Sequence, residues 1–311
     1  MRNIAHFLKQ ELSRQNEILA IDINELLRIN ILKKIHKFNP QIIHVIPGPT
    51  LKLLILLKIL KFYFSDSKIV ISAIHPSTNY LFKKLARILE PDLTLIQSYE
   101  TEALFHGCRM AFLPNGVDTK RFMPVSNESK LLLRDKYGIN RDAFVVLHVG
   151  SVKNGRGIGF LKTIKEEGHE VILVGNKSMG IENDIYNNIM RSGCKSWLDH
   201  LDKIEDIYNI SDCYFFPTPP INTSNSIELP LSVLEAMSCN LPIVTTKFGA
   251  LTRVFEEGNG LIYIDKLEDS LPAIKKIKSG AVTIKTRSKV LPYEWKMINK
   301  RLIDCYENLL I

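Results

Sequence analysis

The chain has 311 residues, 45% of them hydrophobic and 24% charged, which is the balance of a globular protein and excludes a disordered or fibrous chain. This length exceeds that of most single hydrophobic cores, so two domains are expected. The formal net charge is +8, and residues 1–125 carry most of it, with 17 Lys and Arg against 10 Asp and Glu. A basic half of this kind suits nucleic acid, an anionic membrane surface or an acidic small substrate as partner.

No segment is typical of a signal peptide or a transmembrane helix. Charged residues interrupt the apolar positions of the first fifteen residues, and the apolar stretch Leu51 to Phe64 is interrupted by three lysines and is too short to span a bilayer. The five cysteines are scattered, without a Cys-x-x-Cys pair or zinc-ligand spacing. We therefore expect a cytoplasmic protein.

The lysine-rich stretch Leu51 to Phe64 has two interpretations. Its lysines interleave with Leu and Ile, and Lys33, Lys34 and Lys37 precede it, which favours the interfacial face of a helix on an anionic membrane. The alternative is a helix packed on the core with solvated lysines. Nucleic acid is not expected as a partner, because the basic half lacks interleaved aromatic residues and a recognisable binding motif.

Short apolar runs alternate with stretches of helical period, which is typical of βαβ units around a parallel sheet. After a helix over 4–12, strands are predicted at 18–23, 42–46, 69–74, 93–97 and 110–113 in the first half, and at 144–149, 170–174, 213–217, 242–245 and 260–263 in the second. Helices are predicted at 80–89, 157–167, 204–210 and 231–239. The fold class is therefore α/β, with two doubly wound domains.

A turn-rich segment, Leu113-Pro-Asn-Gly-Val-Asp, followed by the polar residues 126–130, places the domain boundary near residue 124. The predicted domains are 1–124 and 125–292, with 124–130 as the linker. Asn115-Gly116 predicts a left-handed turn, and Asp118 is expected to bond its own downstream backbone.

The stretch from 227 to 246 is the most informative for function. Pro230 can begin a helix, and Leu231 and Ser232 then form a helix N-terminus at the carboxyl edge of a parallel sheet, where free amides and the helix dipole favour a diphosphate. Glu235 follows within an apolar run. Ribose hydroxyls donating to its carboxylate would satisfy it, and the alternative is an exposed helix edge.

Val233-Leu-Glu-Ala-Met237 and Pro242 resemble the signature of glycosyltransferase family 4, retaining enzymes of GT-B fold with two Rossmann-like domains facing a cleft. The resemblance implies that Glu235 holds the donor ribose. The family's other glutamate, which contacts the donor sugar, stands eight positions earlier, at Ile227. Glu228 is one position away, and we assign the sugar contact to it.

The Gly-rich loop from His148 to Gly157 follows an apolar strand and opens a helix. In the resembled family, an Arg just after the first glycine and a Lys six positions after it bind the donor phosphates. Gly150 is that first glycine, Ser151 and Arg156 occupy the two positions, and Lys153 is expected to compensate for the missing charge. Arg156 can pair bidentately with a phosphate, and the alternative is a surface arginine in a loop.

His75 ends a predicted strand at the edge where open α/β sheets bind ligands, so it is a candidate catalytic residue, with a structural histidine as the alternative. The C-terminal helix, 293–311, resembles the family's closing helix and is expected to complete the first domain, with Trp295 as an anchor. No Gly-Gly pair occurs before residue 40. The family's first strand and Gly-rich loop are therefore expected to be missing.

No Asp-x-Asp occurs, so no metal and no cofactor are expected. The prediction is a metal-independent, retaining glycosyltransferase that moves a sugar from a nucleotide-sugar donor to a glycan or lipid-linked acceptor. Peripheral association with an anionic membrane, at its inner face, is left open. Two alternatives stay open: a nucleotide-sugar epimerase, and a non-catalytic or truncated relative that binds sugar nucleotides.

Overall fold

A computed structural model describes residues 2–46, 50–74, 90–177, 180–199, 201–220 and 228–311. The predicted helix 80–89 and His75 lie outside the described residues. The chain forms two compact units. Unit 1 comprises residues 1–116, 225–229 and 295–311, and unit 2 comprises 117–224 and 230–294. The units therefore change at 116/117 and 294/295, where the sequence predicted 124/125 and 292/293.

Unit 1 is built on a parallel sheet whose four described strands follow in chain order: β1 (Ile42–Val45), β2 (Lys68–Ala73), β3 (Leu93–Ile96) and β4 (Met110–Phe112). All four coincide with predicted strands. Short runs of β-branched and leucine residues buried on both faces favour this arrangement. The helices of this unit are α1 (Arg2–Leu12), α2 (Ile29–Phe38), α3 (Leu51–Tyr63), α5 (Tyr99–Leu104) and α14 (Trp295–Leu310).

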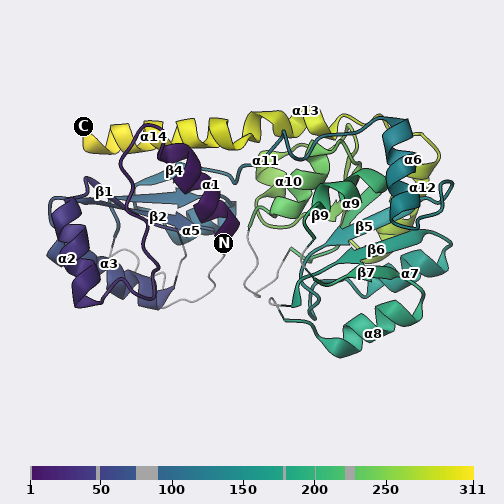
Figure 1. The fold of residues 1–311 in the computed structure, drawn as a ribbon, viewed down its shortest axis with the longest axis horizontal. Coiled ribbons are helices and arrows are strands. Elements are labelled where there is room, and N and C mark those ends of the chain that lie inside the picture. Colours follow the sequence, from purple (N-terminus) through teal and green to yellow (C-terminus); the bar gives the residue numbers. More distant parts are fainter. Residues whose placement is uncertain (1, 47–49, 75–89, 178–179, 200, 221–227) are drawn as a thin grey trace. The chain divides into compact units, whose positions relative to one another are not determined.

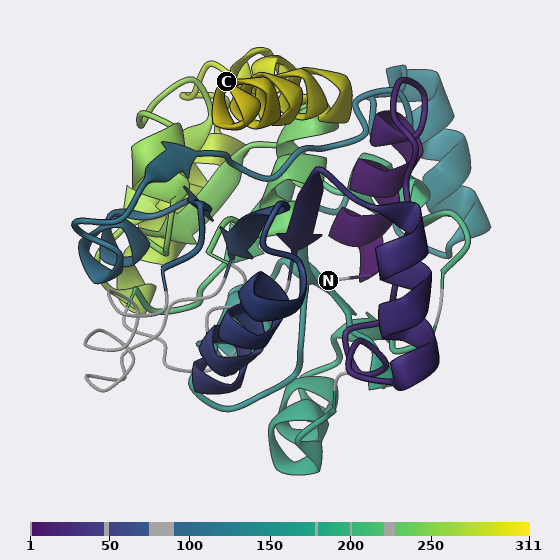
Figure 2. The same ribbon diagram turned by 90° about the vertical axis from the view of Figure 1, so that its left-hand side faces the viewer.

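The two faces of the unit 1 sheet carry different helices because strand residues alternate in direction. Ile69, Ile71 and Ala73 of β2 join the core formed with α2, α3 and α5. Ser72 belongs to the other face, where its hydroxyl lies 2.8 Å from His44 Nε2, while His44 Nδ1 lies 2.6 Å from the Tyr306 hydroxyl of α14. Figures 1 and 2 show α1 and α14 as neighbours in this unit.

The C-terminal helix is part of unit 1. Trp295 stacks on Phe7 of α1, with ring centroids 5.2 Å apart, and its ring lies against Gly116, where an added Cβ would stand 2.6 Å away. Gly116 is therefore needed for close approach. The left-handed turn predicted for Asn115-Gly116 is wrong, because neither residue has a positive φ. The Asp118 expectation is confirmed: its Oδ1 accepts from the amides of Lys120 and Arg121.

The strand predicted over 18–23 is wrong. Residues 17–22 have no regular structure, and a turn follows. Leu19, Ile21 and Ile23 alternate as in a strand, but they pack, partly buried, against the core of unit 1 without pairing to a neighbouring strand. Alternating apolar residues indicate that one side of the chain is buried. A β-strand requires in addition a neighbouring strand with which its backbone pairs.

Unit 2 has a six-stranded parallel sheet in the order β7-β6-β5-β8-β9-β10, formed by β5 (Val145–Val149), β6 (Glu170–Val174), β7 (Lys195–Trp197), β8 (Cys213–Phe216), β9 (Ile243–Thr246) and β10 (Leu261–Ile264). The strand order reverses between β5 and β8, which makes this sheet doubly wound, with a switch point at the carboxyl ends of those strands. β7 was not predicted, since it is short, polar and at the sheet edge.

The helices of unit 2 are α6 (Asn127–Lys136), α7 (Phe160–Glu166), α8 (Asn183–Arg191), α9 (Ile204–Ile210), α10 (Leu231–Ser238), α11 (Leu251–Val254), α12 (Ser270–Lys278) and α13 (Thr286–Val290), with short 3-10 turns at Leu267–Asp269 and Leu291–Tyr293. Ser126 caps α6 by accepting from the Ser129 amide. Residues 127–130 therefore form its first turn, and that part of the linker prediction is wrong. Ser and Asn favour helix caps as well as loops.

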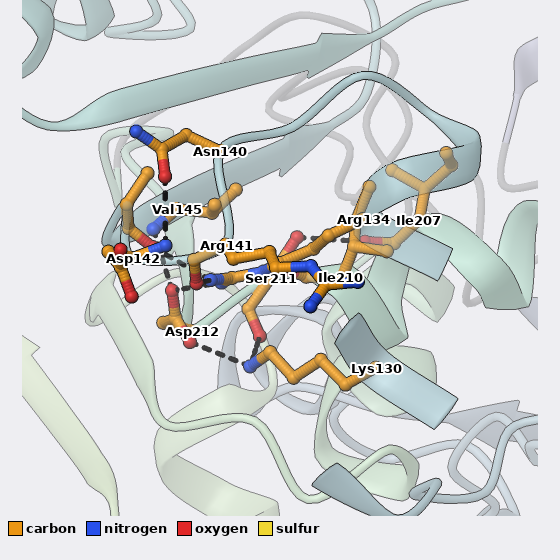
Figure 3. Close-up of polar contacts among 11 residues, drawn as sticks. Lys130, Arg134, Asn140, Arg141, Asp142, Val145, Ile207, Ile210, Ser211 and Asp212 are labelled. Atoms are coloured by element: carbon orange, nitrogen blue, oxygen red, sulfur yellow. Dashed lines mark hydrogen bonds and ion pairs between the residues drawn. The ribbon is translucent and has the colours of Figure 1, made fainter. Parts of the chain in front are cut away.

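Charged side chains join α6 to the amino ends of β5 and β8. Asp212 accepts from Lys130 and from Arg134, both at 2.6 Å, and from the Val145 amide at 2.7 Å. Figure 3 shows these side chains converging on Asp212. Arg134 is buried and also donates to the carbonyls of residues 141, 143 and 210. This cluster lies at the end of the sheet opposite the switch point and is structural.

None of the helices in the described ranges is both long and apolar enough to cross a membrane.

Candidate functional site

The candidate site lies in unit 2, where the chain leaves β5 and β8 at the switch point. Open α/β sheets bind ligands in the crevice outside the carboxyl ends of their strands at this point. The Gly-rich loop follows β5, the segment from Pro217 follows β8, and α10 begins after that segment. Six of the nine predicted site residues belong to this part of unit 2: Gly150, Ser151, Arg156, Leu231, Ser232 and Glu235.

The loop after β5 needs glycine at two positions because the backbone passes close to its neighbours. An added Cβ on Gly150 would lie 2.9 Å from His148 Nε2. Gly157 has φ +68°, and its Cβ would lie 2.5 Å from the Pro217 carbonyl oxygen. The loop is therefore folded onto the segment that follows β8, which brings Arg156 to the switch point.

His148 supports this loop and takes no proton near neutral pH. Its Nδ1 lies 2.9 Å from the Phe215 carbonyl oxygen, and its ring stacks on Phe216. Burial lowers the pKa of His148 to about 4, although the bond to Phe215 acts in the opposite direction, and the positive charge of Arg156 lowers it further. A neutral His148 beside Arg156 adds no competing charge.

Three of the eight buried side-chain polar atoms that have no hydrogen-bond partner in the described part of the chain lie on the two segments that leave the switch point. They are Ser151 Oγ, Arg156 Nε and Thr218 Oγ1. Burial also lowers the pKa of Arg156, the direction expected of a guanidinium drawn out of water. Buried polar groups in native proteins are normally paired. A ligand rich in acceptor oxygens, such as a diphosphate, would pair the arginine and the hydroxyls.

The first turn of α10 is linked to β5 through Tyr214. The Tyr214 hydroxyl donates to the Val149 carbonyl at 3.1 Å and also bonds the Ser232 side chain. Pro230 precedes the helix with an extended conformation, and no side chain caps the free amides of the first turn. Such a helix start favours an anion.

Glu235, one turn into α10, accepts a hydrogen bond from the Tyr208 hydroxyl of α9 at 2.7 Å. Burial raises the pKa of Glu235 to about 7, against the opposing effects of the Tyr208 bond and of the charge of Arg121. The Tyr208 bond fixes the orientation of the carboxylate. Any further hydroxyl that donates to this carboxylate stabilises its ionised form.

Two further predicted residues direct their side chains away from this group, although Lys153 belongs to the same Gly-rich loop. Lys153 extends beside Gly180, in the loop after β6. Glu228 belongs to unit 1, where it is buried and its carboxylate accepts from the Ser98 amide at 3.1 Å, from the Ser98 hydroxyl at 2.7 Å and from the Thr101 hydroxyl. We call these contacts the Glu228 clasp. They occupy both carboxylate oxygens with protein donors.

Sequence reasoning missed Thr218, Tyr208 and Tyr214. Thr218 could have been found, because it follows an apolar strand at the edge of the sheet, the same signal that pointed to His75. The two tyrosines lie in apolar runs typical of core positions, and only their hydroxyl contacts distinguish them. Within the described ranges, no group of His, Cys, Asp and Glu side chains has the arrangement of a metal site. Metal independence stays a prediction.

Comparisons with solved structures define the class of fold. The crystal structure of Anabaena Alr3699/HepE in complex with UDP-glucose matches with a TM-score of 0.70 at 18% identity, over 96% of this chain and 88% of that one. A glycosyltransferase from Rickettsia africae matches with a TM-score of 0.71 at 15% identity, over 97% and 87%. The chain thus has the GT-B fold of glycosyltransferases, as the sequence predicted, while the expected lack of the family's first strand and Gly-rich loop stays a prediction.

The sequence comparisons then give the family. Residues 143–277 match the family model described as Glycosyl transferases group 1. The resemblance to glycosyltransferases that the sequence motifs predicted is confirmed. The chain is 26% identical over 160 residues to an alpha-galactosylglucosyldiacylglycerol synthase of Streptococcus pneumoniae, covering 49% of this chain and 41% of that protein. It is 24% identical over 200 residues to an alpha-monoglucosyldiacylglycerol synthase of Acholeplasma laidlawii, covering 60% and 48%. The chain thus matches less than half the length of these curated relatives.

Proposed function

We propose that this chain is a glycosyltransferase that moves a sugar from a nucleotide-sugar donor to a glycan or lipid-linked acceptor, with retention of configuration and without a metal ion. The observation that carries the proposal is the set of unpartnered buried polar atoms at the switch point, Ser151 Oγ, Arg156 Nε and Thr218 Oγ1. The similarity to two glycolipid synthases supports a lipid-linked acceptor. The match to a protein solved with UDP-glucose makes a UDP-sugar the first donor to test.

In this proposal the donor diphosphate lies against the Gly-rich loop and the start of α10. The bond from the anomeric carbon to the phosphate oxygen breaks, and its electron pair leaves with the diphosphate. Arg156 and the α10 amides stabilise the added negative charge. The acceptor oxygen bonds the anomeric carbon, and its proton passes to the departing phosphate. Glu235 accepts from the ribose hydroxyls and sets the position of the nucleotide. We expect the reaction to take place in the cytoplasm.

The test begins with thermal unfolding of the chain in the presence of UDP-, GDP-, ADP- and TDP-sugars. A donor that binds the folded state at about 100 times its Kd stabilises it by about 2.7 kcal/mol. We expect one donor to stabilise the wild type, and expect Arg156→Ala and Glu235→Ala to lose this shift. Arg141→Ala, at the opposite end of the sheet, is the control and keeps it.

Turnover separates the proposed function from its alternatives. With the stabilising donor and a lipid extract as acceptor, we expect a glycolipid product of retained anomeric configuration whose formation withstands EDTA. Conversion of the donor without acceptor would indicate an epimerase, and donor binding without any product would indicate a non-catalytic relative. Loss of activity with EDTA, restored by Mg²⁺, would contradict the metal-independent mechanism.

A further inference from the structure

A second feature, in unit 1, is not used by the donor site. Helices α2 and α3 both contribute residues to the same core of unit 1, and Figure 1 shows them on the same side of that unit. The exposed basic and large apolar side chains of these two helices and of the turn before α2 make up what we call the α2–α3 face: Leu27, Ile29, Lys33, Lys34, Lys37, Ile55, Lys58, Phe62 and Tyr63.

The charge of this region has a single sign. From residue 26 to residue 65 the sequence contains seven Lys and Arg and no Asp or Glu. Two of the seven have carboxylate partners from outside the stretch, since Arg28 pairs with Glu25 and Lys61 with Asp92. Among the described residues, no ion pair involves Lys33, Lys34, Lys37 or Lys58. These four side chains are exposed and available to an anionic partner.

Large apolar side chains stand among these lysines. Exposed fractions are 84% for Phe62, 73% for Ile29, 58% for Ile55, 57% for Tyr63 and 53% for Leu27. On α3, Ile55, Lys58 and Phe62 fall on one side of the helix by their spacing, as Ile29, Lys33 and Lys37 do on α2. Each helix therefore presents an apolar and basic stripe to solvent.

A groove of about 290 Å³ lies between the two helices. Leu32, Lys33, His36 and Lys37 line it from α2, and Tyr63 and Phe64 line it at the end of α3. Its floor is apolar and two of its lining residues are lysines, the combination that suits an amphiphile with an anionic head.

We propose that the α2–α3 face docks on an anionic phospholipid bilayer, with the lysines at the headgroups and Phe62, Tyr63 and Ile29 entering the interface. Basic residues next to exposed aromatic and aliphatic side chains are typical of interfacial membrane binding. Protein–protein interfaces are depleted in lysine at their centres, and exposed Leu and Ile side chains gain nothing from a nucleic-acid backbone. The proposal extends the proposed function by giving a lipid-linked acceptor a place to meet the chain.

Vesicle co-sedimentation tests this without donor or acceptor, so failure of the proposed function leaves the result interpretable. We expect the full chain to bind vesicles of equal phosphatidylglycerol and phosphatidylcholine, and to bind pure phosphatidylcholine vesicles weakly. A lysine near an anionic surface strengthens binding about fivefold, so K33E/K37E weakens it by at least about 25-fold. F62S/Y63S also weakens it. Raising ionic strength from about 0.1 M to 1 M shortens the Debye length from about 10 Å to 3 Å and releases the protein.

The matched control is K275E/K276E, which makes the same charge change on exposed lysines of α12 in unit 2. We expect this variant to bind like the wild type, and all variants are checked for wild-type unfolding. Three results would overturn the proposal: no preference for anionic vesicles, equal losses in the α12 control and the α2 variant, or tighter binding to a nucleic-acid duplex than to vesicles. A concentration-dependent dimer abolished by F62S/Y63S, without vesicle binding, would assign the face to a second copy instead.

Discussion

Glu235 is a side chain whose chemistry depends on a residue distant in the sequence. In α10 it is the one acid among apolar neighbours, which suggests a ligand contact but leaves an exposed helix edge open. In unit 2 it accepts from Tyr208 of α9, and burial raises its pKa to about 7. The residue is thus near half-protonated at neutral pH when no ligand is bound, and a ribose hydroxyl that donates to it would favour the ionised form.

This raised pKa predicts a pH-dependent stability. The folded state holds a proton on Glu235 up to about pH 7, whereas the unfolded chain releases it near pH 4.5. The contribution of Glu235 is therefore fully present below pH 4.5 and is lost as pH rises to 7, by at most about 3 kcal/mol. In urea unfolding at pH 5 and pH 8, we expect wild type to lose more stability than Glu235→Gln. Equal losses in both proteins would show that Glu235 ionises normally.

Glu228 illustrates a different relation between sequence and site. The sequence suggested a contact with the donor sugar, and the structure places its carboxylate in the Glu228 clasp with Ser98 and Thr101. Burial raises its pKa, and the bonds from these two residues lower it. Ser98 caps α5, so a carboxylate 130 residues away in sequence completes that helix start.

Glu228→Gln separates the two roles. Glutamine keeps the shape but turns one acceptor into a donor facing the Ser98 amide or the hydroxyls. We expect the free energy of unfolding to fall by about 1–3 kcal/mol, because one of the buried donors of Ser98 and Thr101 loses the carboxylate oxygen that accepts its hydrogen bond. Glu100→Gln, an exposed acid in the first turn of the same helix, serves as control and leaves stability nearly unchanged. If Glu228→Gln unfolds like wild type yet loses sugar transfer, Glu228 acts at the donor and the clasp is not its role.

At the scale of elements, α6 shows how local composition can mislead. The polar composition of its first turn predicted a linker, but Ser126 caps a helix there. Arg134, in the last turn of this helix, donates buried hydrogen bonds. Lys130 and Arg134 of α6 pair with Asp212 at the amino ends of β5 and β8 (Figure 3). The helix is thereby fixed to the two central strands whose opposite ends form the candidate site.

Arg134→Met is expected to destabilise unit 2 strongly. The substitution removes the donors of three backbone carbonyls and one of the cations that pair with Asp212. Breaking a buried ion pair from one side typically costs about 3–5 kcal/mol, and chemical denaturation measures it. Arg141→Ala removes an exposed pair with Asp135 instead and should leave the midpoint unchanged. A small effect of Arg134→Met would mean that water replaces these bonds.

At the scale of the whole molecule, each unit is assembled from separate parts of the chain. Unit 1 consists of the first 116 residues of the chain, residues 225–229 and the C-terminal segment 295–311. In the last helix, Trp295 stacks on Phe7 and the Tyr306 hydroxyl lies beside His44. Unit 2 is interrupted by residues 225–229, directly before the start of α10. The segment that leads into the predicted donor helix is thus held by the Glu228 clasp and by Asn115, which donates to the Leu229 carbonyl at 2.8 Å.

Local sequence patterns were sufficient to predict the class of fold, nine of the ten described strands and the helix that carries Glu235, because strands buried on both faces of a parallel sheet are apolar runs that can be recognised locally. They also located the Gly-rich loop, in which Gly150 lies against the His148 ring and Gly157 against the Pro217 carbonyl. Three features became visible only in the folded chain: 18–23 is not a strand, Glu228 is bonded within unit 1, and Tyr208 donates a hydrogen bond to Glu235. Strand pairing and the partners of a buried polar group depend on residues far away in the chain, and a local pattern of residues carries no record of them.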